Sequence, residues 1–312
     1  MNDDTAIRLL RLTPARPGVP EDRAARVREA LHEEWQADVL RRRSRLRRRT
    51  VMAAALVAAA AATVLFVRHD VGRQAIVPPQ PALALVERVD GRFGLLPGEV
   101  VRADEWIETP AGTRVSLRMG ERSLRLDTGT RARLVSTAVI ELSSGALYVD
   151  TNEASPGLEV RTPRGVARDV GTQFEVRLEG AALHVRVRSG RVDVRHPGGV
   201  DSAPAGTLLT LTNDGIRRET TAVYGTGWEW TWQVAPSFSI EGRPLSAVLD
   251  HLAREQGWKV RYADVSLATR AATIVLHGSI DGLSPRDALG VAIAASGLAH
   301  RLDEGTVFVT QP

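Results

Sequence analysis

An uncharged run of 18 residues, Thr50–Val67, constrains the fold more strongly than any other part of the sequence. As an α-helix it would rise about 27 Å, close to the roughly 30 Å hydrocarbon core of a bilayer. Seven of the nine residues before it are arginines, whereas Arg68 is the nearest basic residue after it. The positive-inside bias therefore predicts a single transmembrane helix over 50–67, with the N-terminus in the cytoplasm and the C-terminal bulk outside it.

The arginine cluster is interpreted as a topology anchor that lies against anionic lipid headgroups of the bilayer. Its members are Arg41, Arg42, Arg43, Arg45, Arg47, Arg48 and Arg49. A cleaved signal peptide fits poorly, because about 50 residues precede the apolar run and signal n-regions are short. A twin-arginine export signal around Arg48 and Arg49 matches only weakly, so an uncleaved anchor is favoured.

Charge is distributed unevenly along the chain, and this excludes one class of function. Residues 1–49 hold 13 arginines against 8 acidic residues, whereas 28 basic and 29 acidic residues follow the apolar run. The region beyond residue 67 is therefore close to neutral, and no direct nucleic-acid binding is expected. The chain has no cysteine, which excludes disulfides, thiolate metal sites and cysteine nucleophiles.

The cytoplasmic segment 1–49 is predicted to form two short helices separated by the proline-rich stretch 13–20. Apolar residues recur every three or four positions in the second helix and form one stripe. The stripe residues are Val27, Leu31, Trp35 and Val39. Isolated helices of this length are marginal in water, so the stripe is predicted to bind a partner. A cytoplasmic protein is favoured, with a second copy or the membrane surface as the alternatives.

Residues 68–81 are predicted to be a stiff proline-rich spacer. From 82 to 225, short alternating runs are separated by Gly, Pro, Asp and Asn turns, which is typical of an all-β domain. The motif at 107–112 recurs at 160–165, and a second motif at 144–149 recurs at 189–194. This repetition predicts a short β-solenoid or a sandwich, and the solenoid is preferred.

Alternation within 168–195 predicts which side chains face the core. Phe174 and Val176 share one parity, as do the valines of 185–194, and these positions are expected to point inward. The intervening basic residues are expected to point to water. They are Arg177, Arg186, Arg188, Arg191 and Arg195.

The motifs in this β region resemble the signature of the FecR domain. The matching fold-defining positions are Thr162, Pro163, Gly165, Gly171, Thr172, Phe174, Val176 and Gly190. An earlier Trp106-Ile107-x-Thr109-x-x-Gly112 motif is similar to the same family, and the resemblance spans roughly 103–212. It implies the periplasmic part of a single-pass regulator in the bacterial inner membrane that acts on a cytoplasmic sigma factor.

Three tryptophans, Trp228, Trp230 and Trp232, occupy alternate positions in the segment 226–235. That spacing predicts one face of a strand over Gly225–Trp232. We interpret this aromatic stripe as an interdomain joint or part of a core, in preference to a platform for a ligand.

The final segment, 236–312, shows helical and strand patterns in a β-α-β, β-α-β-β order. Helices are predicted over 244–256, ended by Gly257, and from a Ser284 cap to Gly297. The intervening and closing strands are expected at 238–242, 258–262, 273–277, 299–302 and 306–310. The module resembles the short N-terminal (STN) domain of secretins and signalling TonB-dependent receptors. The resemblance implies that the module receives a signal from a periplasmic or outer-membrane receptor domain.

The expected fold is mainly β with α+β parts. It consists of a short helical cytoplasmic segment, one transmembrane helix, an all-β repeat domain of FecR type and a small C-terminal βαβ-βαββ module. The seven histidines show no metal-ligand spacing. No nucleophile elbow, P-loop or dinucleotide fingerprint occurs, so no catalysis, metal or cofactor is expected.

The leading hypothesis is a membrane-anchored transducer that binds an extracytoplasmic-function sigma factor through residues 1–49, as the FecR resemblance implies. The alternative is an anchored envelope module for binding or structure, with no role in sigma-factor regulation. The apolar stripe around Trp35 distinguishes the two, because a simple anchor has no need of it.

Overall fold

The computed structural model describes residues 80–151 and 157–312. The stripe of Val27, Leu31, Trp35 and Val39, the arginine anchor at 41–49 and the predicted span 50–67 lie outside the described residues. Within the described ranges, no helix has both the length and the apolar character needed to cross a bilayer.

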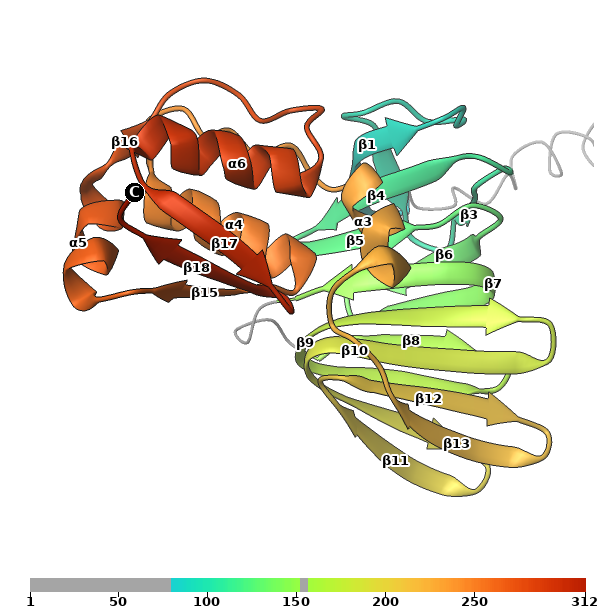
Figure 1. The fold of residues 1–312 in the computed structure, drawn as a ribbon. Coiled ribbons are helices and arrows are strands. Elements are labelled where there is room, and N and C mark those ends of the chain that lie inside the picture. The colour runs from blue at the N-terminus through green and yellow to red at the C-terminus, as the bar shows by residue number, and fades with distance from the viewer. Residues whose placement is uncertain (1–79, 152–156) are drawn as a thin grey trace, which may run out of the picture. The chain divides into compact units, whose positions relative to one another are not determined.

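Most of the described residues up to 220 form one antiparallel-rich sheet, drawn from cyan to yellow in Figure 1. Its strands are β1 (Ala82–Asp90), β2 (Val100–Arg102), β3 (Trp106–Glu108), β4 (Arg114–Met119), β5 (Arg122–Leu126), β6 (Arg131–Ser136), β7 (Val139–Asp150), β8 (Glu159–Thr162), β9 (Gly165–Glu179), β10 (Ala182–His196), β11 (Gly199–Pro204), β12 (Thr207–Thr212) and β13 (Gly215–Thr220). No helix interrupts these strands in the described part, which agrees with the expectation of a mainly β fold.

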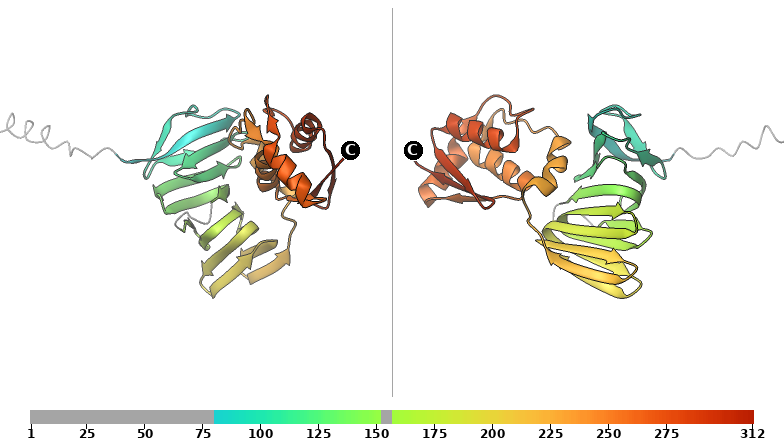
Figure 2. Two further views of the ribbon diagram at one scale, coloured as in Figure 1. Left: turned by 90° about the vertical axis from the view of Figure 1, so that its left-hand side faces the viewer. Right: turned by 45° about the vertical axis from the view of Figure 1, so that its right-hand side comes forward.

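The strands pair along the path β13-β12-β10-β9-β8-β7-β5-β4-β1-β2, with β3, β6 and β11 attached beside it. Both views of Figure 2 show the strands following one another from the β1 end to the β11–β13 end. Neighbouring strands are close in sequence because most connections are tight turns. Local alternation and turn residues are sufficient to specify such pairings.

The core lies on one face of this sheet and is built from in-register rows. Leu124 of β5 is paired with Val149 of β7, and Val149 with Phe174 of β9. Val187 of β10 completes the row beside Phe174. All four side chains are fully buried, as is Val176 in the adjoining row. The inward parity expected for Phe174 and Val176 is thus observed.

A threonine ladder reveals a regular interval that the two longer sequence motifs do not show. Thr109, Thr130, Thr151 and Thr172 are spaced by 21 residues. The backbone N–H of Thr130 donates to Oγ1 of Thr109 at 2.8 Å, and Thr172 donates to Thr151 in the same way at 2.8 Å. The buried hydroxyls therefore satisfy backbone groups where the chain passes from one strand to the next.

Glycines allow the close approach of the chain to this ladder, and substitution tests their role. Gly145 has φ +78°, and an added Cβ would lie 2.5 Å from the Thr130 Cα. We expect Gly145→Ala to lower the free energy of unfolding by about 2–4 kcal/mol, from backbone strain together with overpacking. The control is Gly120→Ala, which has φ +62° and open space around it, and which should cost only about 1 kcal/mol. Equal losses for both variants in urea unfolding would contradict this.

The C-terminal region is a smaller α+β unit with its own core. Its elements are the 3-10 helix η1 (Thr226–Trp228), α3 (Glu229–Gln233), β14 (Arg243–Pro244), α4 (Leu245–Gln256), β15 (Lys259–Tyr262), α5 (Val265–Thr273), β16 (Val275–Leu276), α6 (Pro285–Ser296), β17 (Ala299–Asp303) and β18 (Thr306–Thr310). The strands form a β14-β16 pair and a three-stranded β15-β18-β17 sheet. Helices α4 and α6 end at Gly257 and Gly297, both in the left-handed conformation, and the Ser284 hydroxyl caps α6.

Two expectations for this region are wrong. No strand forms over 238–242, because the chain turns there, with Arg243 N–H donating to the Ile240 carbonyl. Helix α5 was not expected. Asp264 caps it by accepting from the Leu267 N–H at 2.9 Å, but only Leu267 and Ala271 of the helix are buried. So short an apolar repeat gives little helical periodicity to detect.

Candidate functional site at the junction of the sheet and the C-terminal module

A row of polar and aromatic side chains crosses the sheet on the face opposite its core. Arg125 of β5 is paired with Tyr148 of β7, and Tyr148 with Glu175 of β9. Arg186 of β10 lies beside Glu175. Arg125 and Tyr148 are fully buried and Glu175 is 4% exposed, although this face would be expected to be solvated. The segment 223–235 and helix α4 cover these residues, as the following contacts show.

Arg125 and Glu255 of α4 form a buried bidentate ion pair. The two N–H···O distances are 2.7 and 2.8 Å, and Arg125 also donates to the Thr231 carbonyl at 2.9 Å. Burial alone would raise the pKa of Glu255, but the charge of Arg125 outweighs burial and lowers it. Burial likewise opposes the charge on Arg125, whereas Glu255 raises its pKa. Both groups are therefore charged, and each satisfies the other where water is excluded.

Arg188 was expected to point to water, and this is wrong. Its side chain is 4% exposed and donates to the Glu255 carbonyl at 2.6 Å and to the Val223 carbonyl at 3.1 Å. Its guanidinium also lies 4.3 Å from the ring centre of Trp228. The parity of the strand was correct, but the outward face at this point is covered by other residues of the chain. Arg191, further along β10, does remain exposed.

The tryptophan segment is helical, so the strand expected over Gly225–Trp232 is wrong. Trp228 ends η1 and Trp230 lies in α3. Both rings meet Tyr148 edge-on, at centroid distances of 6.1 and 6.4 Å. Trp230 Nε1 donates to the Glu175 carboxylate at 3.2 Å, and burial raises the pKa of Tyr148 to about 12, so its phenol stays protonated. Every-second-residue spacing suits a strand face, but here a turn and a helix direct two of the rings onto the sheet.

Trp232 is directed to the other side of the joint. It packs against the core of the C-terminal module, and its indole N–H donates to the Leu283 carbonyl at 3.4 Å. The joint is therefore held to the sheet by Trp228 and Trp230 and to the module by Trp232. On the sheet side, Arg88 of β1 donates to the Ala235 carbonyl at 3.2 Å.

A second set of contacts joins the end of β7 to the end of α4. Arg254 forms an ion pair with Asp150 and donates to the Thr151 carbonyl at 3.0 Å. The Gln173 amide donates to Asp150 at 3.0 Å and to the Arg254 carbonyl at 3.3 Å. Burial, followed by the nearby charge of Glu255, raises the pKa of Asp150 above its ordinary value. Burial and the charge of Glu255 therefore destabilise the ionised form of Asp150, and the charge of Arg254 offsets this only in part.

The raised pKa of Asp150 predicts a specific pH dependence. The folded protein holds the Asp150 proton more tightly than the unfolded chain, so this group reduces stability as pH rises from about 4 through its folded pKa. Asp150→Asn removes that reduction. The melting temperature of the variant minus that of the wild type should therefore increase with pH over this window. A difference that stays flat or decreases with pH between 4 and 7 would contradict it.

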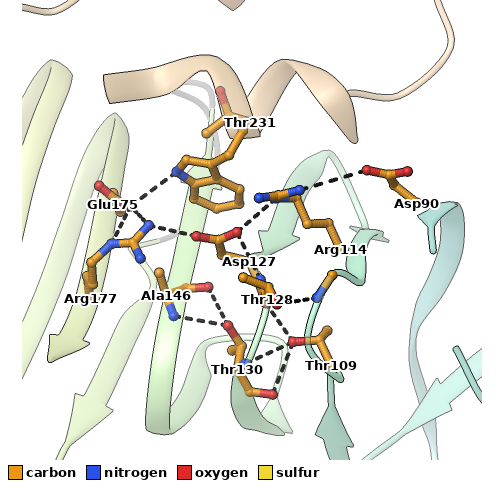
Figure 3. A network of polar contacts seen from close by, with 12 residues as sticks. Asp90, Thr109, Arg114, Asp127, Thr128, Thr130, Ala146, Glu175, Arg177 and Thr231 are labelled. Carbon is orange, nitrogen blue, oxygen red and sulfur yellow. Dashed lines mark hydrogen bonds and ion pairs between the residues drawn. The ribbon is translucent and has the colours of Figure 1, made fainter. Parts of the chain in front are cut away.

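The polar network continues from the junction across the sheet to β1, as Figure 3 shows. Arg177 bridges Glu175 at 2.7 Å and Asp127 at 2.8 Å. Arg114 then joins Asp127 at 2.8 Å to Asp90 at 3.9 Å. Alternating charges therefore connect the row beneath Trp230 with the first strand of the sheet.

The residues of the FecR-like motif build turns and core, and they lie in the sheet itself. Thr162 Oγ1 donates to the Gly165 carbonyl at 2.8 Å, within the Pro163-containing turn. An added Cβ on Gly190 would lie 2.5 Å from Thr172 Cγ2. Gly171 has φ +68°. None of these motif residues takes part in the contacts described above between the sheet and the module.

The junction residues Arg125, Tyr148, Glu175 and Glu255 were not identified from the sequence. One signal was present: Glu255 lies three residues after Leu252, on the apolar stripe of the α4 pattern. An acid on an apolar stripe indicates a buried partner. Arg125 and Glu175 gave no such signal, because charged residues at outward strand positions are ordinary.

Within the described residues, no group of three or more potential ligands could hold a metal ion.

Comparison with known proteins identifies a family domain within the sheet. Residues 105–193 match the family model described as FecR protein. No curated protein matches the chain.

Two crystal structures, at 2.50 and 1.65 Å resolution, of a Parabacteroides distasonis ATCC 8503 protein described as a candidate anti-sigma factor are similar to this chain. The sequence identity to this chain is 18% in each case. Each alignment covers 67% of this chain and 99% of the chain in the crystal structure, with TM-scores of 0.37 and 0.36.

Proposed function

We propose that this chain, which carries a FecR domain, is a membrane-anchored signal transducer that regulates an extracytoplasmic-function sigma factor. The FecR domain is the observation that carries the proposal, since this family is regulatory. The charge asymmetry around 50–67 adds the topology. Residues 1–49 lie in the cytoplasm of this arrangement and bind the sigma factor, and residue 68 onward lies in the periplasm.

The periplasmic part is proposed to receive the signal through its C-terminal module, residues 236–312. The STN-like resemblance suggests pairing with a receptor domain of the envelope. The joint at 226–235 and the β domain at 82–225 then connect this module to the membrane anchor. Signalling in this scheme requires no catalysis by the chain.

The junction gives this transmission a physical basis. Buried ion pairs link α4 to β5 and β7. A separate chain of charges starts at Glu175, which accepts from Trp230 of the joint, and reaches β1, the strand that follows the spacer. A ligand or receptor shifts an equilibrium only if it binds one arrangement better than another. Buried ion pairs are suited to favouring one arrangement over another, because separating the two partners leaves a buried charge uncompensated and raises the free energy.

The direct test is recovery of partners from cells. The full-length chain is crosslinked in its native host, purified from membranes and analysed by mass spectrometry. We expect a sigma factor to co-purify, and Trp35→Asp to reduce its recovery at least about tenfold, because a charge in an apolar contact is strongly disfavoured. Gln36→Asp adds the same charge beside the stripe and should leave recovery unchanged. Absence of any sigma factor, with partners unaffected by Trp35→Asp, would favour an anchored envelope module without a regulatory role.

A further inference from the structure

A cleft of about 850 Å³ lies beside the junction. Three parts of the described structure line it: the end of β1, the joint with the residues on either side of it, and the C-terminal module. The module contributes α4 with Trp258 after it, the loop at 280–286 and the turn at 304. Its volume falls within the range of small-molecule sites. None of the junction contacts described above requires such a space.

The wall of the cleft is aromatic. Trp232 and Phe238 come from the joint side, Trp258 follows α4, and Tyr224 precedes η1. All four are partly exposed, so each ring offers surface to the cleft. Phe238 is held in place by His251, whose ring stacks on it at a centroid distance of 3.6 Å. Arg243 lies 4.7 Å from the centre of the same ring, so Phe238 is fixed before any ligand arrives and already has a cation beside it. Trp232 is held by its hydrogen bond to the Leu283 carbonyl, and a bound cation would contact chiefly Trp232, Trp258 and Tyr224.

The charged residues of the cleft are predominantly acidic. Two guanidinium groups, of Arg88 and Arg286, are outnumbered by four carboxylates. The carboxylates are those of Asp90, Glu229, Asp281 and Glu304. Arg88 donates to the Ala235 carbonyl and Asp90 lies 3.9 Å from Arg114, so part of the capacity of each is already used. The lining thus carries a net charge of minus two, with His251 neutral because burial lowers its pKa.

We propose that this cleft binds a small organic cation with an apolar or aromatic body. Aromatic faces attract cations, and carboxylates at the rim complement the same charge. A ligand there touches β1, the joint and the module at once. Its binding therefore favours the arrangement in which these three parts are together. This assignment does not depend on the cytoplasmic segment or on a sigma factor.

The test uses the full-length chain in nanodiscs of zwitterionic lipid, with empty nanodiscs as the blank. Three probes of similar size are compared by calorimetry: benzyltrimethylammonium, neutral benzyl alcohol and anionic benzenesulfonate. We expect the cation to bind about tenfold more tightly than the alcohol and the sulfonate to bind least. The cation should also raise the melting temperature of the chain.

Variants with opposite expected signs make the result specific to the cleft. Glu229→Gln with Glu304→Gln should weaken binding of the cation about threefold to tenfold, whereas Arg286→Gln should strengthen it about twofold to threefold. The control pair, Glu179→Gln with Glu219→Gln, lies on β9 and β13 outside the cleft and should change nothing. Because all these side chains are at the surface, the variants should fold. Equal binding of cation and sulfonate, no saturable binding of the cation, or equal effects of the two glutamate pairs would overturn the proposal.

Discussion

Replacing Arg125 with methionine is expected to lower the free energy of unfolding by about 3–5 kcal/mol. The arginine is fully buried and Glu255 is 6% exposed at the side chain, so the substitution leaves a carboxylate buried without its partner. The carbonyl of Thr231 also loses its donor. The loss comes mainly from the desolvated charge left behind, because the pair itself contributes little relative to apolar packing.

A double-mutant cycle separates these two effects. Arg125→Met combined with Glu255→Met should recover most of the loss and approach or exceed wild-type stability. Urea unfolding monitored by both fluorescence and circular dichroism gives the free energies. Arg191→Met is the matched control: it removes an arginine that is 57% exposed and 3.6 Å from Asp193, and should change stability by no more than about 0.5 kcal/mol. Additive losses in the double variant would contradict the burial of the pair.

Truncating Trp228 to alanine should also cost about 3–5 kcal/mol. The ring is 2% exposed and lies between the sheet and the joint. Arg186 and Arg188 stack over it at 3.8 and 4.3 Å, and Tyr148 meets its edge. Removing the ring opens a cavity among these groups and leaves the two guanidinium groups with fewer contacts.

Trp106 provides a close comparison for this prediction. It also carries two arginines, Arg131 and Arg133, at 3.9 and 4.9 Å from its ring, but it is 37% exposed. Trp106→Ala should cost about 1 kcal/mol, since exposed cation–π contacts are weak and no enclosed cavity forms. Thermal unfolding of the two variants measures the difference. Similar losses for Trp106 and Trp228 would show that the junction is not a tightly packed interface.

Strands were predictable from this sequence because their signal is local. The two-residue period of β9 and β10 determined which side chains share a face, and Phe174 and Val185 are buried as that parity requires. Parity does not say what covers the opposite face. Arg188 was therefore assigned to water, although α4, distant in sequence, lies over it.

The helical regions also show that local sequence patterns do not predict long-range contacts. Alternate tryptophans fit a strand, but Trp228 and Trp230 belong to short helices, and their rings lie against Tyr148 of the sheet. The candidate site depends on contacts between residues more than 100 positions apart, such as Arg125 and Glu255. Only Glu255, on the apolar stripe of α4, indicated a buried partner. No local pattern identified Arg125 as that partner.

Transmission of the signal through the junction is measured most directly by transcription that depends on the co-purifying sigma factor, recorded by RNA sequencing in cells carrying junction variants. We expect Arg125→Met combined with Glu255→Met, which removes the pair and keeps stability near that of the wild type, to change expression of those genes while the chain stays in the membrane at normal abundance. The Arg191→Met control should leave expression at the wild-type level. Unchanged transcripts in the strain with both substitutions, with normal abundance of the chain, would contradict transmission of the signal through the junction.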